Sequence, residues 1–96
     1  RKNVSANGFI EATILITPKG NIHNRPLITF RGLPIYEKEE FQNGLEDEID
    51  RTVKSFSLNN KKQETNLVDA LKSTCRKFTK LKTGKRPLAN INLVRI

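Results

Sequence analysis

Hydrophobic residues recur along the chain with two spacings, one typical of strands and one typical of helices. Residues 8–17 (GFIEATILIT) are rich in β-branched and apolar side chains, which predicts a strand, in the middle of a sheet if both of its faces are buried. Residues 18–21 (PKGN) predict a turn, because proline presets one φ angle and glycine or asparagine accepts a positive one. Residues 22–30 predict a second strand. Pro26 indicates that this strand lies at a sheet edge or is interrupted there, since proline donates no ladder hydrogen bond.

Two longer segments show the three- and four-residue spacing of amphipathic helices. Residues 39–56 form the first, with acidic residues at its start, where the helix dipole favours anions. Its apolar face is expected to consist of Phe41, Leu45, Ile49, Val53 and Phe56. Gly44 lies inside this helix and should cost about 1 kcal/mol relative to alanine. Residues 57–63 (SLNNKKQ) predict a polar connector.

The second helix is expected over residues 66–82. Asn66 is the predicted N-cap, and Gly84 followed by Pro87 predicts the C-terminal end. The buried stripe of this helix is expected to comprise Leu67, Leu71, Cys75 (or Thr74), Phe78 and Leu81. Residues 88–96 (LANINLVRI) alternate in part and predict a third strand.

These elements follow one another in the order β-β-α-α-β. They predict an α+β fold in which two helices pack on one face of a three-stranded mixed or antiparallel sheet. In the first strand, Ile10, Ile14 and Ile16 share one side, whereas Phe9 and Leu15 share the other. The sheet face without helices therefore retains apolar side chains, which makes it a candidate oligomer interface.

The length of 96 residues suits one domain over residues 1–96. The chain begins with Arg1 and contains no methionine, so we expect an excised or processed part of a longer protein, with residues 1–7 as a linker. The sequence has no run of about eighteen apolar residues, so no membrane partner is expected. The single cysteine, Cys75, fits a reducing cytoplasmic location and is either a small core residue or a reactive thiol.

Positive charge is concentrated near the C-terminus. The formal net charge is +8. Residues 1–69 contain ten basic and ten acidic residues, so the whole excess comes from residues 70–96, where eight basic and no acidic residues occur. Acidic residues cluster between Glu37 and Asp50. An acidic and a basic face are therefore expected, which favours contact with nucleic acid or with a complementary protein surface.

Residue types that support catalysis are few. His23 is the sole histidine and Cys75 the sole cysteine, so the sequence has neither a histidine pair nor a CxxC zinc motif. It also lacks the phosphate-binding GxxxxGK motif. The acidic run from Glu37 to Asp50 does not have calcium-loop spacing and is expected to be a solvated helix face. The sequence therefore predicts no catalytic residue, no metal site and no cofactor for the chain itself.

Basic side chains on the second helix are the one feature with binding chemistry. Lys72, Arg76 and Lys80 are spaced by four residues and so lie along one side of the helix, and Lys85 and Arg86 extend the series. Such a row can neutralise successive phosphates of RNA. Two alternatives stay open: a solvated helix face, and a contact with acidic residues of a neighbouring subunit.

Two parts of the chain are similar to the C-terminal domain of ribonuclease J. Residues 27–33 (LITFRGL) resemble the exit of the hairpin in that family. Residues 70–80 (ALKSTCRKFTK) and residues 83–96 (TGKRPLANINLVRI) resemble its closing helix, its KRP turn and its final strand. The resemblance extends over nearly the whole chain, and the order of the elements agrees with it.

The resemblance implies a bacterial parent enzyme with a metallo-β-lactamase fold and an inserted β-CASP domain. Such an enzyme is a zinc-dependent ribonuclease that processes and degrades RNA, both from the 5′ end and internally. The family's HxHxDH zinc motif is absent here, so zinc is expected in the parent's catalytic domains. The resemblance further implies that this end domain supports full activity and assembly into a homo-oligomer. The alternative is an RNA-binding module that uses the basic row.

Overall fold

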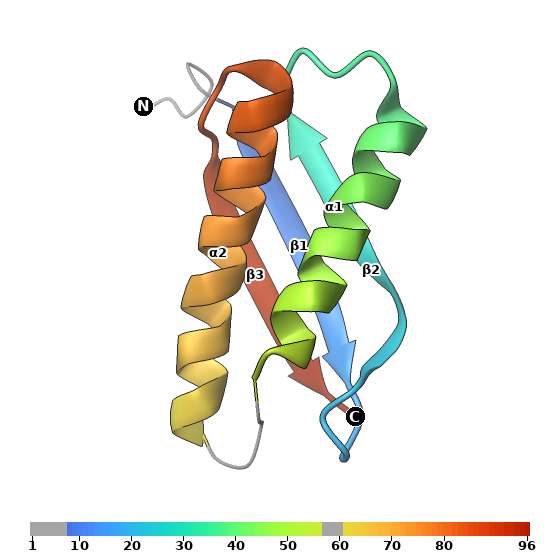
Figure 1. Cartoon of the computed structure of the whole chain (residues 1–96), viewed down its shortest axis with the longest axis vertical. Helices are drawn as coiled ribbons and strands as arrows, with labels where there is room; N and C mark the ends of the chain where they lie inside the picture. Colours follow the sequence, from blue (N-terminus) through green and yellow to red (C-terminus); the bar gives the residue numbers. More distant parts are fainter. Residues whose placement is uncertain (1–7, 57–60) are drawn as a thin grey trace.

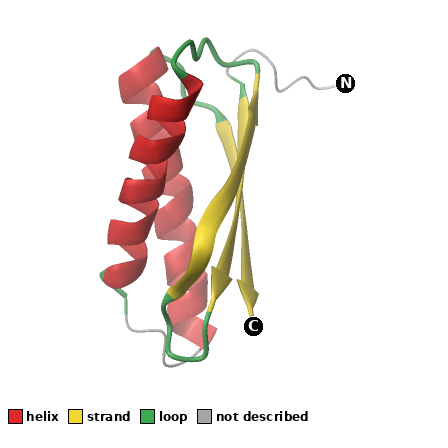
Figure 2. Cartoon of the chain, turned by 90° about the vertical axis from the view of Figure 1, so that its right-hand side faces the viewer, coloured by secondary structure: helices red, strands yellow, loops and turns green. Residues whose placement is uncertain are grey.

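The computed structural model describes residues 8–56 and 61–96. It contains three strands, β1 (Phe9–Ile16), β2 (Ile22–Arg31) and β3 (Leu88–Arg95), and two helices, α1 (Lys38–Lys54) and α2 (Lys61–Thr83). Both helices pack on the same face of the sheet (Figure 1; Figure 2). The predicted α+β fold with the order β-β-α-α-β is confirmed. The predicted linker, residues 1–7, lies outside the described residues.

The sheet is mixed, with the strand order β2-β1-β3. β1 pairs antiparallel with β2 and parallel with β3. The ladder between β1 and β2 is irregular between the pairs Thr13↔Leu27 and Leu15↔His23, because β2 contributes more residues to this interval than β1 does. Pro26 lies in this bulge on an edge strand, where its missing N–H interrupts no regular ladder, as predicted.

The observed helix boundaries confirm the first predicted helix and correct the start of the second. α1 ends at Lys54, two residues before the predicted end. α2 begins at Lys61, so the prediction of Asn66 as its N-cap was wrong. The residues from Lys61 to Glu64 are strong helix formers, and the helix therefore extends through them instead of stopping at a polar connector. The other part of that connector, residues 57–60, lies outside the described residues.

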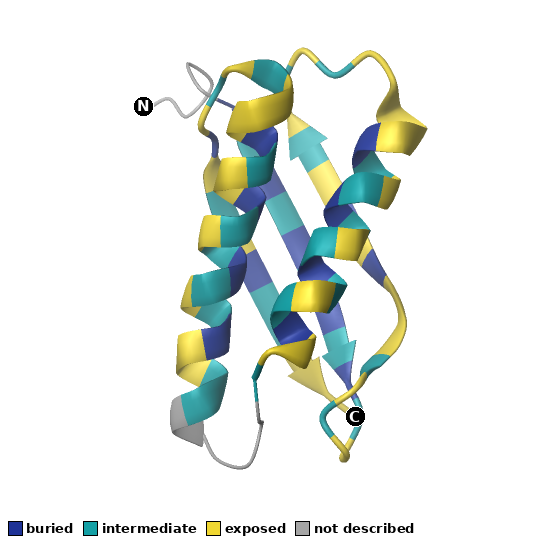
Figure 3. Ribbon diagram, in the orientation of Figure 1, coloured by how far each residue is buried: buried dark blue, intermediate teal, exposed yellow. Residues whose placement is uncertain are grey.

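The core lies between the helices and the inner face of β1. Alternate β1 residues are buried, as a strand with one covered face requires (Figure 3). The helices contribute the apolar faces predicted from their spacing, apart from the end of α2 and from Phe56, which lies beyond the end of α1 and is half-buried. The fully or nearly fully buried apolar residues are Ile10, Ala12, Ile14, Ile16, Ile28, Phe41, Leu45, Ile49, Val53, Leu67, Leu71, Cys75 and Ile91.

The last turns of α2 differ from the predicted stripe. Leu81 is 79% exposed, so its assignment to the core was wrong. Two successive steps of three residues, from Cys75 to Phe78 to Leu81, rotate the position by about 120° away from the core direction. The step of four residues leads instead to Thr79, which is fully buried. Within the described residues the Thr79 hydroxyl has no hydrogen-bond partner.

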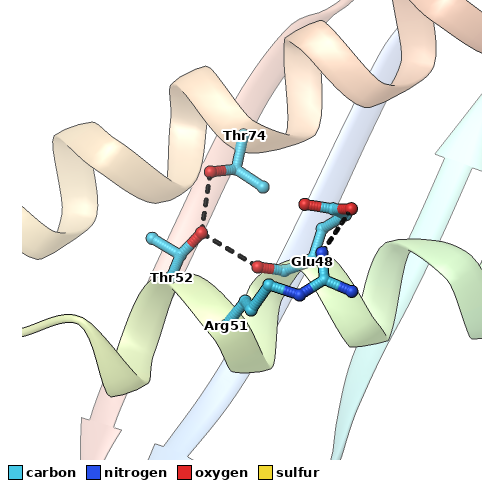
Figure 4. Close-up of polar contacts among 4 residues, drawn as sticks. All are labelled: Glu48, Arg51, Thr52 and Thr74. Carbon is cyan, nitrogen blue, oxygen red and sulfur yellow. Dashed lines mark hydrogen bonds and ion pairs between the residues drawn. The ribbon is translucent and has the colours of Figure 1, made fainter.

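A polar contact joins the last turn of α1 to the middle of α2 (Figure 4). The Thr52 hydroxyl donates to the carbonyl oxygen of Glu48 at 2.9 Å, which uses its only hydrogen. The Thr74 hydroxyl therefore donates to Thr52 Oγ1, and the two oxygens are 2.9 Å apart. This pair orients Thr74 toward α1, and the residues on the other side of α2 consequently border β3.

Gly44 has a packing role that helix propensity does not reveal. A Cβ atom at this position would lie 2.8 Å from Cζ of Phe78, closer than van der Waals contact allows. The Phe78 ring is held in place, with its centroid 5.3 Å from that of Phe41 and 5.5 Å from the Lys82 ammonium. The glycine on α1 therefore makes room for an aromatic ring of α2.

We expect Gly44→Ala to destabilise the fold by about 1 kcal/mol, because an overpacking cost of about 1–3 kcal/mol exceeds the gain in helix propensity of about 1 kcal/mol. Chemical denaturation of the two chains measures this difference. In a Phe78→Leu background the same substitution should become neutral or stabilising. If Gly44→Ala stabilises the wild-type chain, the Phe78 ring moves aside without cost and the glycine is not needed for packing.

Candidate interaction surfaces

One side of α2 borders β3 at the edge of the sheet. The Glu64 carboxylate pairs with the guanidinium of Arg95 on β3. One turn later, Val68 lines an open hollow together with Leu93 of β3. Residues spaced by four from these two positions continue along the same side of the helix, which drifts gradually toward solvent.

The basic row predicted from the sequence occupies this continuation. Lys72 follows Val68 at a spacing of four and is half-buried, whereas Arg76 and Lys80 are exposed. Lys80 Nζ also donates to the carbonyl oxygen of Gly84 at 3.4 Å, near the C-terminal end of α2. The basic row, defined here as Lys72, Arg76 and Lys80, therefore begins beside β3 and turns outward along the helix.

The two remaining predicted basic residues lie in the loop that connects α2 to β3. Gly84 ends the helix with a positive φ of 80°, and its N–H donates to the carbonyl oxygen of Lys80 at 2.8 Å. The Lys85 N–H donates to Thr83 Oγ1 at 3.1 Å, and the Arg86 side chain is exposed. These residues extend the positive charge beyond the end of the basic row.

Acidic residues of α1 are engaged by basic residues of the same chain. Glu46 pairs with Arg25 of the β2 bulge at 2.9 Å. Glu48 pairs with Arg51 at 2.7 Å, and Asp50 pairs with Lys54 at 3.0 Å. These contacts fit the expected solvated helix face, and they reduce the negative charge available to the basic row of a neighbouring subunit.

The sheet face opposite the helices is uncovered and has a polar centre. Glu11 of β1 accepts hydrogen bonds at Oε2 from Nδ2 of Asn90 and of Asn92, each at 2.9 Å. Asn92 Nδ2 also donates to Thr13 Oγ1 at 3.2 Å. Sequence reasoning did not identify this cluster. The sequence does show polar residues at alternate positions of both strands, Glu11 and Thr13 on β1 and Asn90 and Asn92 on β3. Which of them meet depends on the parallel register of the two strands.

Apolar side chains flank this polar centre on the uncovered face. Phe9 and Leu15 lie there, as predicted, and both are half-buried. The register places Leu27, Leu88 and Val94 on the same face, because they are opposite outward-facing β1 residues. The large apolar residues that are exposed in the described chain are Leu27, Tyr36, Leu81, Leu88, Val94 and Ile96. Half of this set, Leu27, Leu88 and Val94, thus belongs to the strands, and Ile96 directly follows β3.

The residues with catalytic or metal-binding chemistry do not converge. His23 is exposed on β2, whereas Cys75 is buried in α2. Burial raises the pKa of the Cys75 thiol to about 12, which favours the core interpretation over a reactive thiol. No group of three or more His, Cys, Asp and Glu side chains within residues 8–56 and 61–96 is arranged to hold a metal ion. These residues do not fit a zinc site.

The part of the chain that the structure describes contains no helix long and apolar enough to cross a membrane. Comparison with protein families matches residues 1–96 to the ribonuclease J C-terminal domain. A search of curated proteins found no significant match.

Proposed function

The chain belongs to the family of ribonuclease J C-terminal domains, and from this premise we propose that it is a non-catalytic domain that assembles its parent ribonuclease into a homo-oligomer. The parent enzyme's zinc and its catalytic residues then lie in its other domains, which are also partners of this domain. Full activity of the parent depends on this assembly. A cytoplasmic location fits the reduced Cys75.

The uncovered sheet face is the observation that supports assembly. Two helices shield one face of the sheet, and the other face presents apolar side chains from all three strands. Exposed apolar groups gathered on one face are typical of protein interaction sites rather than of free surface. A second protein surface that covers Leu88, Val94 and Ile96 would remove this apolar area from water.

Sedimentation of the 96-residue chain tests this proposal. We expect a mass above that of the monomer that rises with protein concentration and changes little with salt, because apolar contacts are not screened. Leu88→Ser combined with Val94→Ser should weaken the association. Tyr36→Ser combined with Leu81→Ser is the matched control, since these residues are also exposed but lie away from the sheet. A monomeric mass at every concentration contradicts the proposal.

The basic row supports a second candidate function, RNA binding. Three cations along one side of α2, extended by Lys85 and Arg86, can follow a phosphate backbone. Phosphate contacts carry no base information, so binding would be independent of sequence. This function is compatible with assembly, because the basic row and the uncovered sheet face are different surfaces.

Neutralising the basic row tests the RNA-binding function. Lys72→Gln, Arg76→Gln and Lys80→Gln together should weaken binding of single-stranded RNA by about tenfold. The slope of log affinity against log salt should fall by about 0.7 for each lost contact, hence by about 2. The control replaces the same number of cations on α1, namely Lys38, Arg51 and Lys54, by glutamine. Equal losses in both variants would indicate attraction by net charge rather than by this row.

A further inference from the structure

The two edges of the sheet differ in how they are protected. Edge strands that remain free in solution are usually interrupted, because a regular edge invites pairing with another strand. β2 is interrupted by its bulge and Pro26, and Asn24 has a positive φ of 63°. β3 is regular over its whole length, and each of its residues is in register with β1. It contains no proline, and its single charged residue is Arg95 at its end.

The main-chain groups of β3 alternate between β1 and the open edge. Leu88 N–H donates to the carbonyl oxygen of Gly8 at 3.1 Å, and Ile96 N–H donates to Ile16 at 3.0 Å. Since successive residues of a strand direct these groups to opposite sides, every second residue from Leu88 onward bonds to β1. Ala89, Ile91 and Leu93 therefore direct their N–H and C=O groups away from the sheet. No backbone hydrogen bond among the described residues outside the regular elements reaches them.

We propose that β3 pairs antiparallel with β3 of a second copy of the chain, about a twofold axis at Ile91, to form a continuous six-stranded sheet. This inference rests on the proposed assembly function and adds to it a contact at the β3 edge, separate from the uncovered sheet face. Ile91 then faces Ile91 of the second copy, and Ala89 faces Leu93. Each of the three pairs exchanges two main-chain hydrogen bonds, so six outward N–H groups and six outward C=O groups, from two copies, are all satisfied.

The side chains of β3 suit this register. On the uncovered face, Leu88 lies opposite Val94 of the second copy, and Asn90 lies opposite Asn92. These are an apolar pair and an amide pair, and neither sets like charges against each other. On the helix face, the hollow that Val68 and Leu93 line lies at the same edge and would be covered by the second copy. The edge is therefore self-complementary in both hydrogen bonding and apolar contact.

Amide hydrogen exchange of the 96-residue chain, measured by NMR at a high and a low protein concentration, tests the pairing directly. At high concentration the amides of Ala89, Ile91 and Leu93 should exchange as slowly as those of Asn90 and Asn92, which bond to β1. On dilution only the first set should lose its protection. Protection of the first set that persists in a monomer would mean that the chain itself covers the edge, which overturns the proposal.

Two sets of variants provide an independent check. Ala89→Pro removes one outward donor and should weaken dimerisation by about tenfold or more, whereas Ala89→Ser keeps the N–H and should not. Since the proline variant could fail to fold, a second test mixes chains carrying Asn90→Cys with chains carrying Asn92→Cys. Oxidation should link the two kinds of chain, because opposite residues of an antiparallel pair meet disulfide geometry. Mixing Thr29→Cys with Asn92→Cys should give no disulfide. Cys75 is buried and should form no disulfide in any of these mixtures.

The outcomes separate this inference from the proposed function. A dimer with protected edge amides and a mixed cross-link supports both. A dimer whose edge amides exchange rapidly, and which withstands Ala89→Pro, overturns the edge pairing but leaves assembly through the sheet face intact. A chain that is monomeric throughout overturns both.

Discussion

Replacing Phe41 with alanine is expected to destabilise the fold by about 3–5 kcal/mol, because it empties a buried aromatic site. Phe41 is 5% exposed, and its ring lies 5.6 Å from that of Phe30 and 5.3 Å from that of Phe78. It thus connects β2, α1 and α2 within one aromatic cluster. A loss of this size is a large fraction of the total stability of about 5–15 kcal/mol that a domain has. Urea denaturation followed by circular dichroism measures it.

Two comparisons make this prediction specific. Phe41→Leu keeps most of the side-chain volume and should cost about 1.5 kcal/mol or less. Phe78→Ala should cost less than Phe41→Ala, because Phe78 is only half-buried. If Phe78→Ala proves the more damaging of the two, the aromatic cluster is centred on Phe78 of α2 rather than on Phe41 of α1.

Alkaline solution is expected to destabilise the chain through Cys75. Burial raises the pKa of this thiol from 9.0 to about 12. Above pH 9 the unfolded chain releases the thiol proton whereas the folded chain retains it, so the free energy of unfolding falls as pH rises. The contribution of this group is complete below pH 9 and is lost progressively toward pH 12. At about 1.36 kcal/mol for each pH unit, the loss reaches about 4 kcal/mol.

The pH dependence of Cys75→Ala isolates this effect. The two chains differ only at position 75, so the difference between their denaturation curves from pH 8 to pH 11 reports the thiol alone. The folded wild-type chain should also react with a thiol reagent about a thousandfold more slowly than the unfolded chain at pH 8, in proportion to its thiolate fraction. Rapid labelling of the folded chain would place Cys75 at the surface and exclude the buried geometry.

Assembly at the β3 edge and RNA binding by the basic row would reinforce each other. Lys72, the first residue of the basic row, follows Val68 by one helical turn, and Val68 lines the hollow with Leu93 of β3. Pairing of two β3 strands would bring the basic rows of two copies near the same edge. A longer phosphate backbone could then contact both rows, and binding would depend on protein concentration as well as on salt.

Local patterns in the sequence determined the kinds of elements and their order. The alternation in β1, the spacing of Phe41, Leu45 and Ile49, and the stop at Gly84 depend on backbone geometry that neighbouring residues specify. The basic row was predictable for the same reason, since residues spaced by four always share a side of a helix. Family resemblance carried by such local segments was confirmed over residues 1–96.

The tertiary structure decided what depends on contacts between distant residues. No local rule states that β3 lies beside β1 in parallel, and that register alone brings Asn90 and Asn92 to Glu11. Gly44 is needed because the Phe78 ring of α2 packs against it, which the sequence of α1 alone does not show. The orientation of α2 about its axis exposes Leu81 and buries Thr79. Spacing along one element defines which side chains share a face, but only the neighbouring elements determine which face is covered, because burial arises from contacts between elements.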